Sequence, residues 1–135
     1  MAPISTSDAV AAAEFRSILR QFLRRSEQIA RKSGLTPQRY LLLLMVKGAP
    51  DGSEQSTVTE LAERLQLAQS TVTELVSRAE EAGLLEREQS QTDARVAHLR
   101  LTEEGERRLA LAFTGLATER SNLRKAFAYV DSVVL

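Results

Sequence analysis

The fold is decided by residues 57–84, which read TVTELAERLQLAQSTVTELVSRAEEAGL. Leucine, valine and alanine recur at helical spacing on both sides of a short break, so the stretch predicts two helices, over residues 60–66 and 70–82. Thr57 and Glu60 have the spacing of a capping box, which marks the start of a helix. Two short helices joined by about three residues form a helix-turn-helix.

A β-hairpin is predicted directly after the second helix. Gly83 is a usual helix end, residues 84–88 alternate loosely between apolar and polar, and residues 95–101 alternate more strictly. The polar residues 89–94 between them form the tip of the hairpin. A helix-turn-helix followed by such a hairpin is the arrangement of a winged helix.

Long amphipathic helices are predicted on both sides of this unit. Residues 8–32 carry two adjacent apolar rows at helical spacing, and residues 103–134 continue in helical periodicity with one break. A short, almost wholly apolar helix over residues 38–47 is expected at the centre of the core. The predicted fold class is mainly α with a small β wing. Residues 1–135 form a single domain whose winged helix-turn-helix lobe spans residues 37–101.

The apolar rows of the flanking helices indicate a surface for a second subunit. They present more aromatic and aliphatic side chains than one small lobe covers: Phe15, Ile18, Phe22, Phe113, Leu116, Leu123, Phe127 and Val130. A homodimer built from residues 8–32 and 103–134 would bury them. A helix well buried within a monomer would show the same pattern, so both interpretations stay open, with the dimer favoured.

Composition disfavours most enzyme classes and membrane insertion. The chain has no cysteine, which excludes thiolate metal sites. It has one histidine, His98, so a histidine-based catalytic pair has a single candidate. No apolar run approaches the roughly 20 residues that cross a bilayer. We therefore expect a cytoplasmic protein that is not an enzyme and holds neither cofactor nor metal.

Charge is distributed unevenly along the chain. Eighteen Lys and Arg balance eighteen Asp and Glu overall, but residues 51–105 carry five basic and twelve acidic residues, a net charge of −7. Residues 1–50 carry eight basic and three acidic residues, a net charge of +5. The helix-turn-helix therefore lies in the acidic part of the chain, where a phosphate backbone is repelled.

Six motifs together resemble the MarR family of transcriptional regulators. They match the family in order and spacing: Gly34-Leu35-Thr36-Pro37-Gln38-Arg39-Tyr40, Thr59-Glu60-Leu61-Ala62-Glu63-Arg64-Leu65, Ser70-Thr71-Val72-Thr73 with Leu75-Val76, Gly83-Leu84-Leu85, Asp93-Ala94-Arg95 and Leu101-Thr102-Glu103-Glu104-Gly105. The most specific piece is Asp93-x-Arg95 followed six residues later by Leu101-Thr102. The resemblance covers residues 34–109, and the flanking helices fit the same architecture more loosely.

The resemblance implies a homodimer that reads a roughly palindromic site in double-stranded DNA. The second helix of the motif would enter the major groove, and the wing arginine would reach the flanking minor groove. DNA contact is thereby assigned to Ser70, Thr71, Thr73, Glu74, Ser77, Arg78, Asp93 and Arg95. Each assignment has a structural alternative, because hydroxyls at a helix start often cap the helix and an Asp–Arg pair on a hairpin is often a surface ion pair.

Glu74 departs from the family pattern, since many relatives carry a basic residue there. A glutamate can accept a hydrogen bond from a cytosine amine, or it can simply repel phosphate. We favour repulsion, because the whole lobe is acidic. The same acidity motivates an alternative function, a winged-helix dimer that serves as a protein-interaction module with weak or lost DNA binding.

The favoured function is a homodimeric, sequence-specific DNA-binding transcriptional regulator, a repressor that responds to a small molecule. Relatives bind small aromatic or anionic effectors in a cleft between the dimer helices and the lobe. The resemblance places Arg39 and Tyr40 near that cleft. Plain core and surface positions are the alternative for these two residues.

Overall fold

The computed structural model describes residues 1–130, with side chains through Ala128. Its elements, in chain order, are α1 (Thr6–Lys32), α2 (Pro37–Lys47), β1 (Gln55–Ser56), α3 (Val58–Leu65), α4 (Gln69–Glu81), β2 (Leu85–Gln89), β3 (Ala97–Leu101), α5 (Glu103–Gly115) and α6 (Ala117–Val130). This is the expected mainly helical fold with a small β wing. Among the described residues, no helix is both long and apolar enough to span a bilayer.

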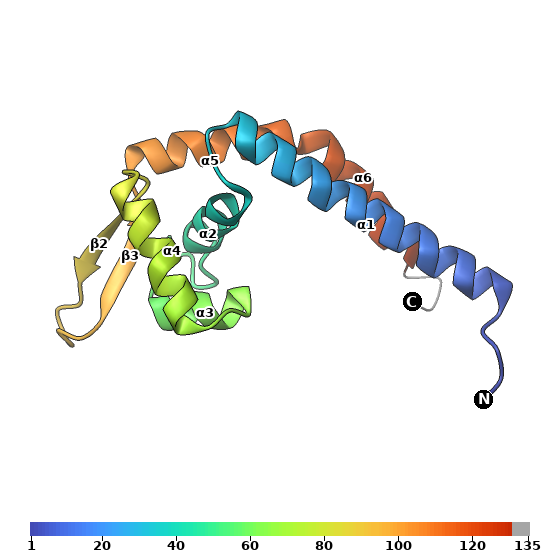
Figure 1. Cartoon of the computed structure of the whole chain (residues 1–135), viewed down its shortest axis with the longest axis horizontal. Coiled ribbons are helices and arrows are strands. Elements are labelled where there is room, and N and C mark those ends of the chain that lie inside the picture. The colour runs from blue at the N-terminus through green and yellow to red at the C-terminus, as the bar shows by residue number, and fades with distance from the viewer. Residues whose placement is uncertain (131–135) are drawn as a thin grey trace.

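The chain has a lobe, formed by α2 to β3, and an arm, formed by α1 and α6, that projects from it (Figure 1). α5 connects the two parts. Inside the lobe, α2 occupies the centre and contacts α3, α4, α5 and two of the strands. Its Leu42, Leu43 and Val46 are fully buried, which explains why its sequence is almost wholly apolar.

The helix-turn-helix forms as its sequence indicates. The Thr57 hydroxyl accepts a hydrogen bond from the Glu60 backbone N–H, and the Glu60 carboxylate accepts one from the Thr57 N–H, each at 3.2 Å. This capping box starts α3 two residues earlier than expected, because it makes Thr57 the cap itself. Gln66 then adopts a left-handed conformation with φ of 58°, which ends α3.

The wing is a three-stranded antiparallel sheet in the order β1-β3-β2. Arg87 of β2 lies opposite Leu99 of β3, and Ser56 of β1 lies opposite Leu99 on the other edge. Leu99 and Leu101 are buried while Arg100 is exposed, as the strict alternation of this strand predicts. From the sequence, a very short strand is expected at Thr57-Val58; the structure has this strand two residues earlier, at β1.

The arm is held together by packing and one ion pair between its two helices. Phe15 of α1 and Phe127 of α6 meet edge to face, with ring centroids 5.3 Å apart. The Arg25 guanidinium lies 3.1 Å from the Glu119 carboxylate. From the sequence, Thr6 or Ser7 is expected to cap the first helix, but in the structure Ser5 caps α1 by accepting a hydrogen bond from the Asp8 N–H.

Glu104, in the first turn of α5, should remain ionised to a lower pH than an ordinary glutamate. Its carboxylate accepts hydrogen bonds from Arg107 at 2.6 and 2.9 Å and from Arg108 at 2.8 Å, and these bonds lower its pKa from 4.5 to about 2. Because the folded pKa lies below the unfolded value, the stabilisation is fully present above pH 4.5 and is lost as the pH falls toward 2.

An NMR titration of the side-chain carboxyl groups checks this expectation. At a pH of about 3.5, where a glutamate side chain in a model peptide is largely protonated, Glu104 should still give the signal of a carboxylate. In Arg107→Gln, the Glu104 midpoint should move up toward the ordinary range. A wild-type midpoint in the ordinary range would show that the pair with the two arginines does not form in solution.

Candidate nucleic-acid interface

α4 presents one polar face to solvent and one apolar face to the core. Val72, Val76 and Ala79 are fully buried against the rest of the lobe. Six of the eight residues assigned to DNA contact lie on the opposite, exposed face: Ser70, Thr71, Thr73, Glu74, Ser77 and Arg78. A helix whose outward side chains are short and polar can lie against the base edges of a major groove.

The hydroxyl groups at the start of α4 form no hydrogen bond with the described part of the chain. The cap position is Ala68, which makes no side-chain cap hydrogen bond. Ser70, Thr71 and Thr73 make no side-chain hydrogen bond to any described residue. These hydroxyls therefore do not cap the helix. Both the hydroxyls and the first backbone N–H groups of α4 are available to hydrogen-bond an anionic partner.

Glu74 and Arg78 form a close ion pair one helical turn apart on this face. The Arg78 guanidinium donates to the Glu74 carboxylate at 2.6 Å, and the two side chains are 62% and 63% exposed. An acidic residue four positions before a basic one is the favourable orientation on a helix. The spacing of four residues between Glu74 and Arg78 is the signal in the sequence from which this pair could have been predicted.

The tip of the wing carries Arg95, whose side chain is 91% exposed. The Asp93 carboxylate accepts from the Arg95 backbone N–H at 3.0 Å and from its guanidinium at 3.2 and 3.4 Å. These bonds lower the pKa of Asp93. Asp93 thus holds both the backbone turn and the side chain of Arg95.

Every arginine between residues 51 and 105 is bound to an acceptor in the described structure. Arg87 makes two hydrogen bonds to Glu80, at 2.6 and 3.1 Å, and Arg100 lies 3.3 Å from Glu88. Arg64 donates to backbone carbonyls at the end of α2. Most of these contacts join different elements, so sequence spacing alone could not reveal them.

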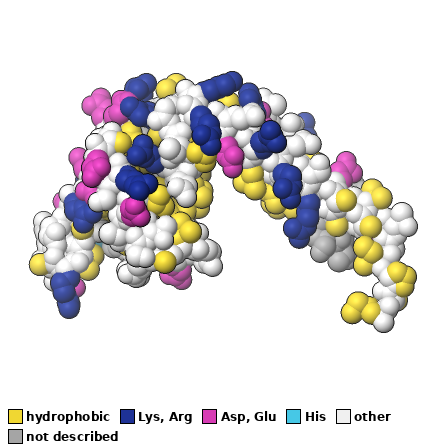
Figure 2. Space-filling model, in the orientation of Figure 1, with side chains coloured by type: hydrophobic (Ala, Val, Ile, Leu, Met, Phe, Trp, Pro, Cys, Tyr) yellow, Lys and Arg dark blue, Asp and Glu magenta, His cyan; other side chains and the backbone are white. Residues whose placement is uncertain are grey.

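The arm differs from the lobe in charge. Figure 2 shows Lys and Arg side chains along it. Arg16, Arg20 and Arg24 form an exposed row on α1 and make no ion pair with a described residue. Among residues 1–130, no group of three or more His, Cys, Asp or Glu is arranged to hold a metal ion.

Residues 33–96 match the model of the MarR family. The matched residues contain α2, the helix-turn-helix and two of the three strands, and they make up a little less than half of the chain. Among curated proteins, none matches the chain.

Solved structures of MarR-family proteins share the fold. AbsC, a MarR family transcriptional regulator from Streptomyces coelicolor, matches with a TM-score of 0.69 at 19% identity, over 99% of this chain and 86% of its own. A mutant MarR from E. coli complexed with operator DNA matches with a TM-score of 0.68 at 16% identity, over 90% and 86%. Sco3205, a MarR family transcriptional regulator from Streptomyces coelicolor in complex with DNA, matches with 0.67 at 20%, over 93% and 77%.

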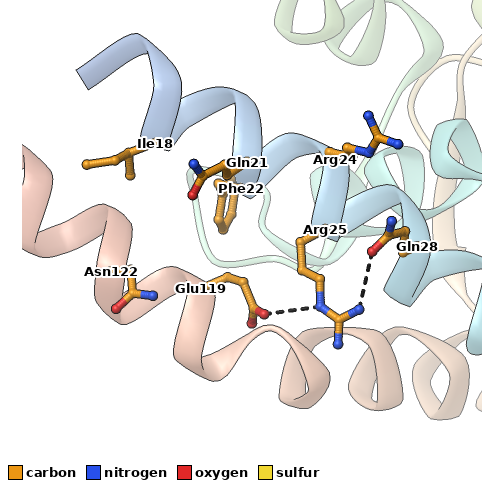
Figure 3. A pocket seen from close by; sticks show the side chains of 8 residues that line it. All are labelled: Ile18, Gln21, Phe22, Arg24, Arg25, Gln28, Glu119 and Asn122. Atoms are coloured by element: carbon orange, nitrogen blue, oxygen red, sulfur yellow. Dashed lines mark hydrogen bonds and ion pairs between the residues drawn. The ribbon is translucent and has the colours of Figure 1, made fainter. Parts of the chain in front are cut away.

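Apolar surface is left without cover on the arm and on α5. Phe113 and Phe127 are exposed, and Phe15, Ile18 and Phe22 are only half-buried. Ile18 and Phe22 line a groove of about 340 Å³ between α1 and α6, and the Arg25–Glu119 pair also lies in its wall (Figure 3). These five side chains were all expected at a dimer interface.

The three other residues assigned to the dimer interface are placed differently. Leu116 is 1% exposed and packs in the core of its own chain, so its burial needs no second subunit. Leu123 is half-buried on α6. Val130 ends α6, and its side chain lies outside the described residues.

Of the two residues expected near an effector cleft, only Tyr40 lines a pocket there. The pocket, about 280 Å³, lies between α1 and α2 and is otherwise mostly apolar, with Phe22, Leu23 and Leu44 in its wall. Burial raises the pKa of the Tyr40 hydroxyl, partly opposed by the charge of Arg120. Arg39 is half-buried and does not line this pocket.

Proposed function

We propose that the chain is a homodimeric, sequence-specific DNA-binding transcriptional regulator, a cytoplasmic repressor that responds to a small molecule. One observation carries the proposal. α4 exposes a row of hydroxyls that bond to no described residue, beside a wing whose tip presents a highly exposed arginine. Two structural relatives with the same fold, MarR and Sco3205, are solved with DNA.

In the proposed complex, α4 lies in the major groove and the wing arginine reaches the neighbouring minor groove. Ser70, Thr71 and Thr73 meet phosphates or base edges, with Ser77 and Arg78 further along the same face. Asp93 acts indirectly, by holding Arg95 at the hairpin tip. A narrow minor groove has an enhanced negative potential that attracts an arginine.

Residues 1–135 form a single domain, and the proposed dimer forms through its arm and α5. Apolar surface is exposed on both: Phe127 on the arm and Phe113 on α5. Two-fold symmetry gives two lobes with the same orientation to DNA, so the site they read is roughly palindromic. The pocket beside Tyr40, between arm and lobe, is placed to receive a small aromatic or anionic effector that alters the spacing of the lobes.

Selection of bound sequences from a random duplex pool tests the proposal. We expect enrichment of a roughly palindromic site with half-sites about one helical turn apart. Recovery of no enriched sequence, together with no salt-dependent association with any duplex, would reject DNA binding.

A second candidate function is a protein-interaction module that keeps the winged-helix dimer without useful DNA affinity. The observation that favours it is the binding of all five arginines of the acidic segment to acceptors within the chain. Titration of binding to random duplex against salt separates the two functions. A DNA reader associates weakly and with steep salt dependence, whereas an interaction module shows no association.

Arg95→Ala should weaken operator binding by about 1–3 kcal/mol and reduce the salt dependence by roughly one phosphate contact per subunit. The melting temperature should hardly change, because the side chain is 91% exposed and buries little. Fluorescence anisotropy over a range of salt concentrations measures both effects. Arg107→Ala, an exposed arginine of α5, is the control; equal affinity of a folded Arg95→Ala and the wild type would remove Arg95 from the interface.

A further inference from the structure

The outward face of α4 carries its one cation in a neutralised form. Arg78 lies on the same side as Ser70, Thr71 and Ser77, and its guanidinium donates to Glu74 at 2.6 Å. α4 contains no other Lys or Arg. A phosphate that approaches this face of the free protein therefore meets a closed ion pair and not a free guanidinium.

We propose that Glu74 masks Arg78 and thereby determines how strongly the lobe binds DNA independently of sequence. This inference rests on the proposed function. It assigns Glu74 an effect through Arg78, which differs from plain repulsion of phosphate and from direct recognition of a cytosine amine.

The geometry of the pair supports masking. Both side chains are more than 60% exposed, so the pair is open to solvent and a competing anion can reach it. An exposed pair of this kind is weak, so phosphate can displace the carboxylate, but the displaced carboxylate stays nearby on the same helix. Sequence-independent binding depends on Lys and Arg neutralising phosphates, and it is therefore the component of affinity most reduced by masking.

The neighbouring arginines do not replace Arg78. Arg87 is bound at two points by Glu80, and Arg95 is bound by Asp93. Glu80 is only 27% exposed, so the Arg87 pair is less open than the Arg78 pair. Release of Arg78 is thus the change that adds a free cation to the exposed face of α4.

A double-mutant cycle tests the inference, with a labelled duplex of random sequence as the probe. The four proteins are the wild type, Glu74→Gln, Arg78→Gln and the double variant, measured by anisotropy over a range of salt concentrations. Glu74→Gln should bind roughly three- to tenfold more tightly and gain about 0.9 in the salt slope for each phosphate that a freed Arg78 contacts. In the Arg78→Gln background, Glu74→Gln should change neither quantity.

Glu81→Gln is the matched control, because Glu81 is an exposed glutamate of α4 that makes no ion pair with a described residue. It removes the same charge and frees no arginine, so its salt slope should equal that of the wild type. Circular dichroism should give the same melting temperature for all five proteins, since every substituted side chain is exposed.

Three results would overturn the inference. Equal tightening by Glu74→Gln in both backgrounds would indicate plain repulsion. Weaker binding of Glu74→Gln to the selected operator alone would indicate recognition of a base. Salt-dependent binding by the wild type that no substitution alters would place this face of α4 away from DNA, while the proposed function stands. If the wild type binds no duplex at all and no sequence is selected, the proposed function fails with it.

Discussion

Phe127→Asp is expected to convert the protein from a dimer into a folded monomer and to weaken operator binding by roughly 100-fold or more. Phe127 is 52% exposed on the arm and rests edge to face on Phe15. In the proposed dimer a second subunit covers this ring, so a carboxylate here would be buried without a partner. A monomer engages one half-site only and loses the gain from binding two linked half-sites.

Light scattering and operator titration measure the two effects. The wild type should scatter as a dimer at micromolar concentration, and Phe127→Asp should give the 14.9 kDa of one chain. Phe127→Leu, which keeps the position apolar, should remain a dimer with nearly the wild-type affinity. Phe22→Asp is harder to interpret. Phe22 is a half-buried residue of α1 that faces α2, so its replacement also disturbs the fold of the single chain.

The helical content of Phe127→Asp decides how the result is interpreted. Because the ring is half exposed in a single chain, circular dichroism should show helical content close to that of the wild type. A 14.9 kDa wild type at every accessible concentration would reject the dimer. A dimeric Phe127→Asp would place the interface elsewhere on the chain.

Local signals allowed most of the lobe to be predicted from the sequence. The Thr57–Glu60 capping box and the alternation of Leu99 and Leu101 both act over a few residues, and both appear in the structure as expected. β1 was missed by two residues, because a strand of two residues has no periodicity of its own and exists only through its pairing with β3. Ser5 was missed as the cap of α1 because Ser5, Thr6 and Ser7 are equally able to serve.

The candidate site was less predictable, since its properties depend on contacts between elements. Arg87 meets Glu80 because β2 passes beside the end of α4, and no sequence spacing encodes that approach. Arg39 and Tyr40 are neighbours in sequence, but successive helix residues point about 100° apart, so only Tyr40 faces the pocket between α1 and α2. The charge pattern predicted an acidic lobe, whereas the structure adds that its arginines are already bound.

The Leu101-Thr102-Glu103-Glu104-Gly105 motif joins the wing to α5 through close backbone contacts. The Thr102 N–H donates to the Leu84 carbonyl at 3.1 Å, and the Thr102 hydroxyl donates to the Gly83 carbonyl at 2.5 Å and accepts from the Gly105 N–H at 3.1 Å. Gly105 is buried against Leu84. A methyl group at Gly105 would overlap the Leu84 carbonyl oxygen and lie 3.1 Å from the carbonyl carbon.

Gly105→Ala is therefore expected to destabilise the protein by about 3 kcal/mol, from overpacking against backbone and the loss of the Thr102–Leu84 hydrogen bond. At an exposed helix position the same substitution would stabilise by up to about 1 kcal/mol, so the sign of the change is itself diagnostic. Denaturant unfolding at fixed protein concentration gives the free energy. Gly115→Ala is the control in the same helix, because the atoms nearest its methyl group belong to the Ile29 side chain. A side chain can shift more readily than backbone, so the loss of stability should be smaller. A Gly105→Ala protein as stable as the wild type would mean that α5 can move away from Leu84 without a loss of stability. The close backbone contacts between the wing and α5 would then not stabilise the protein.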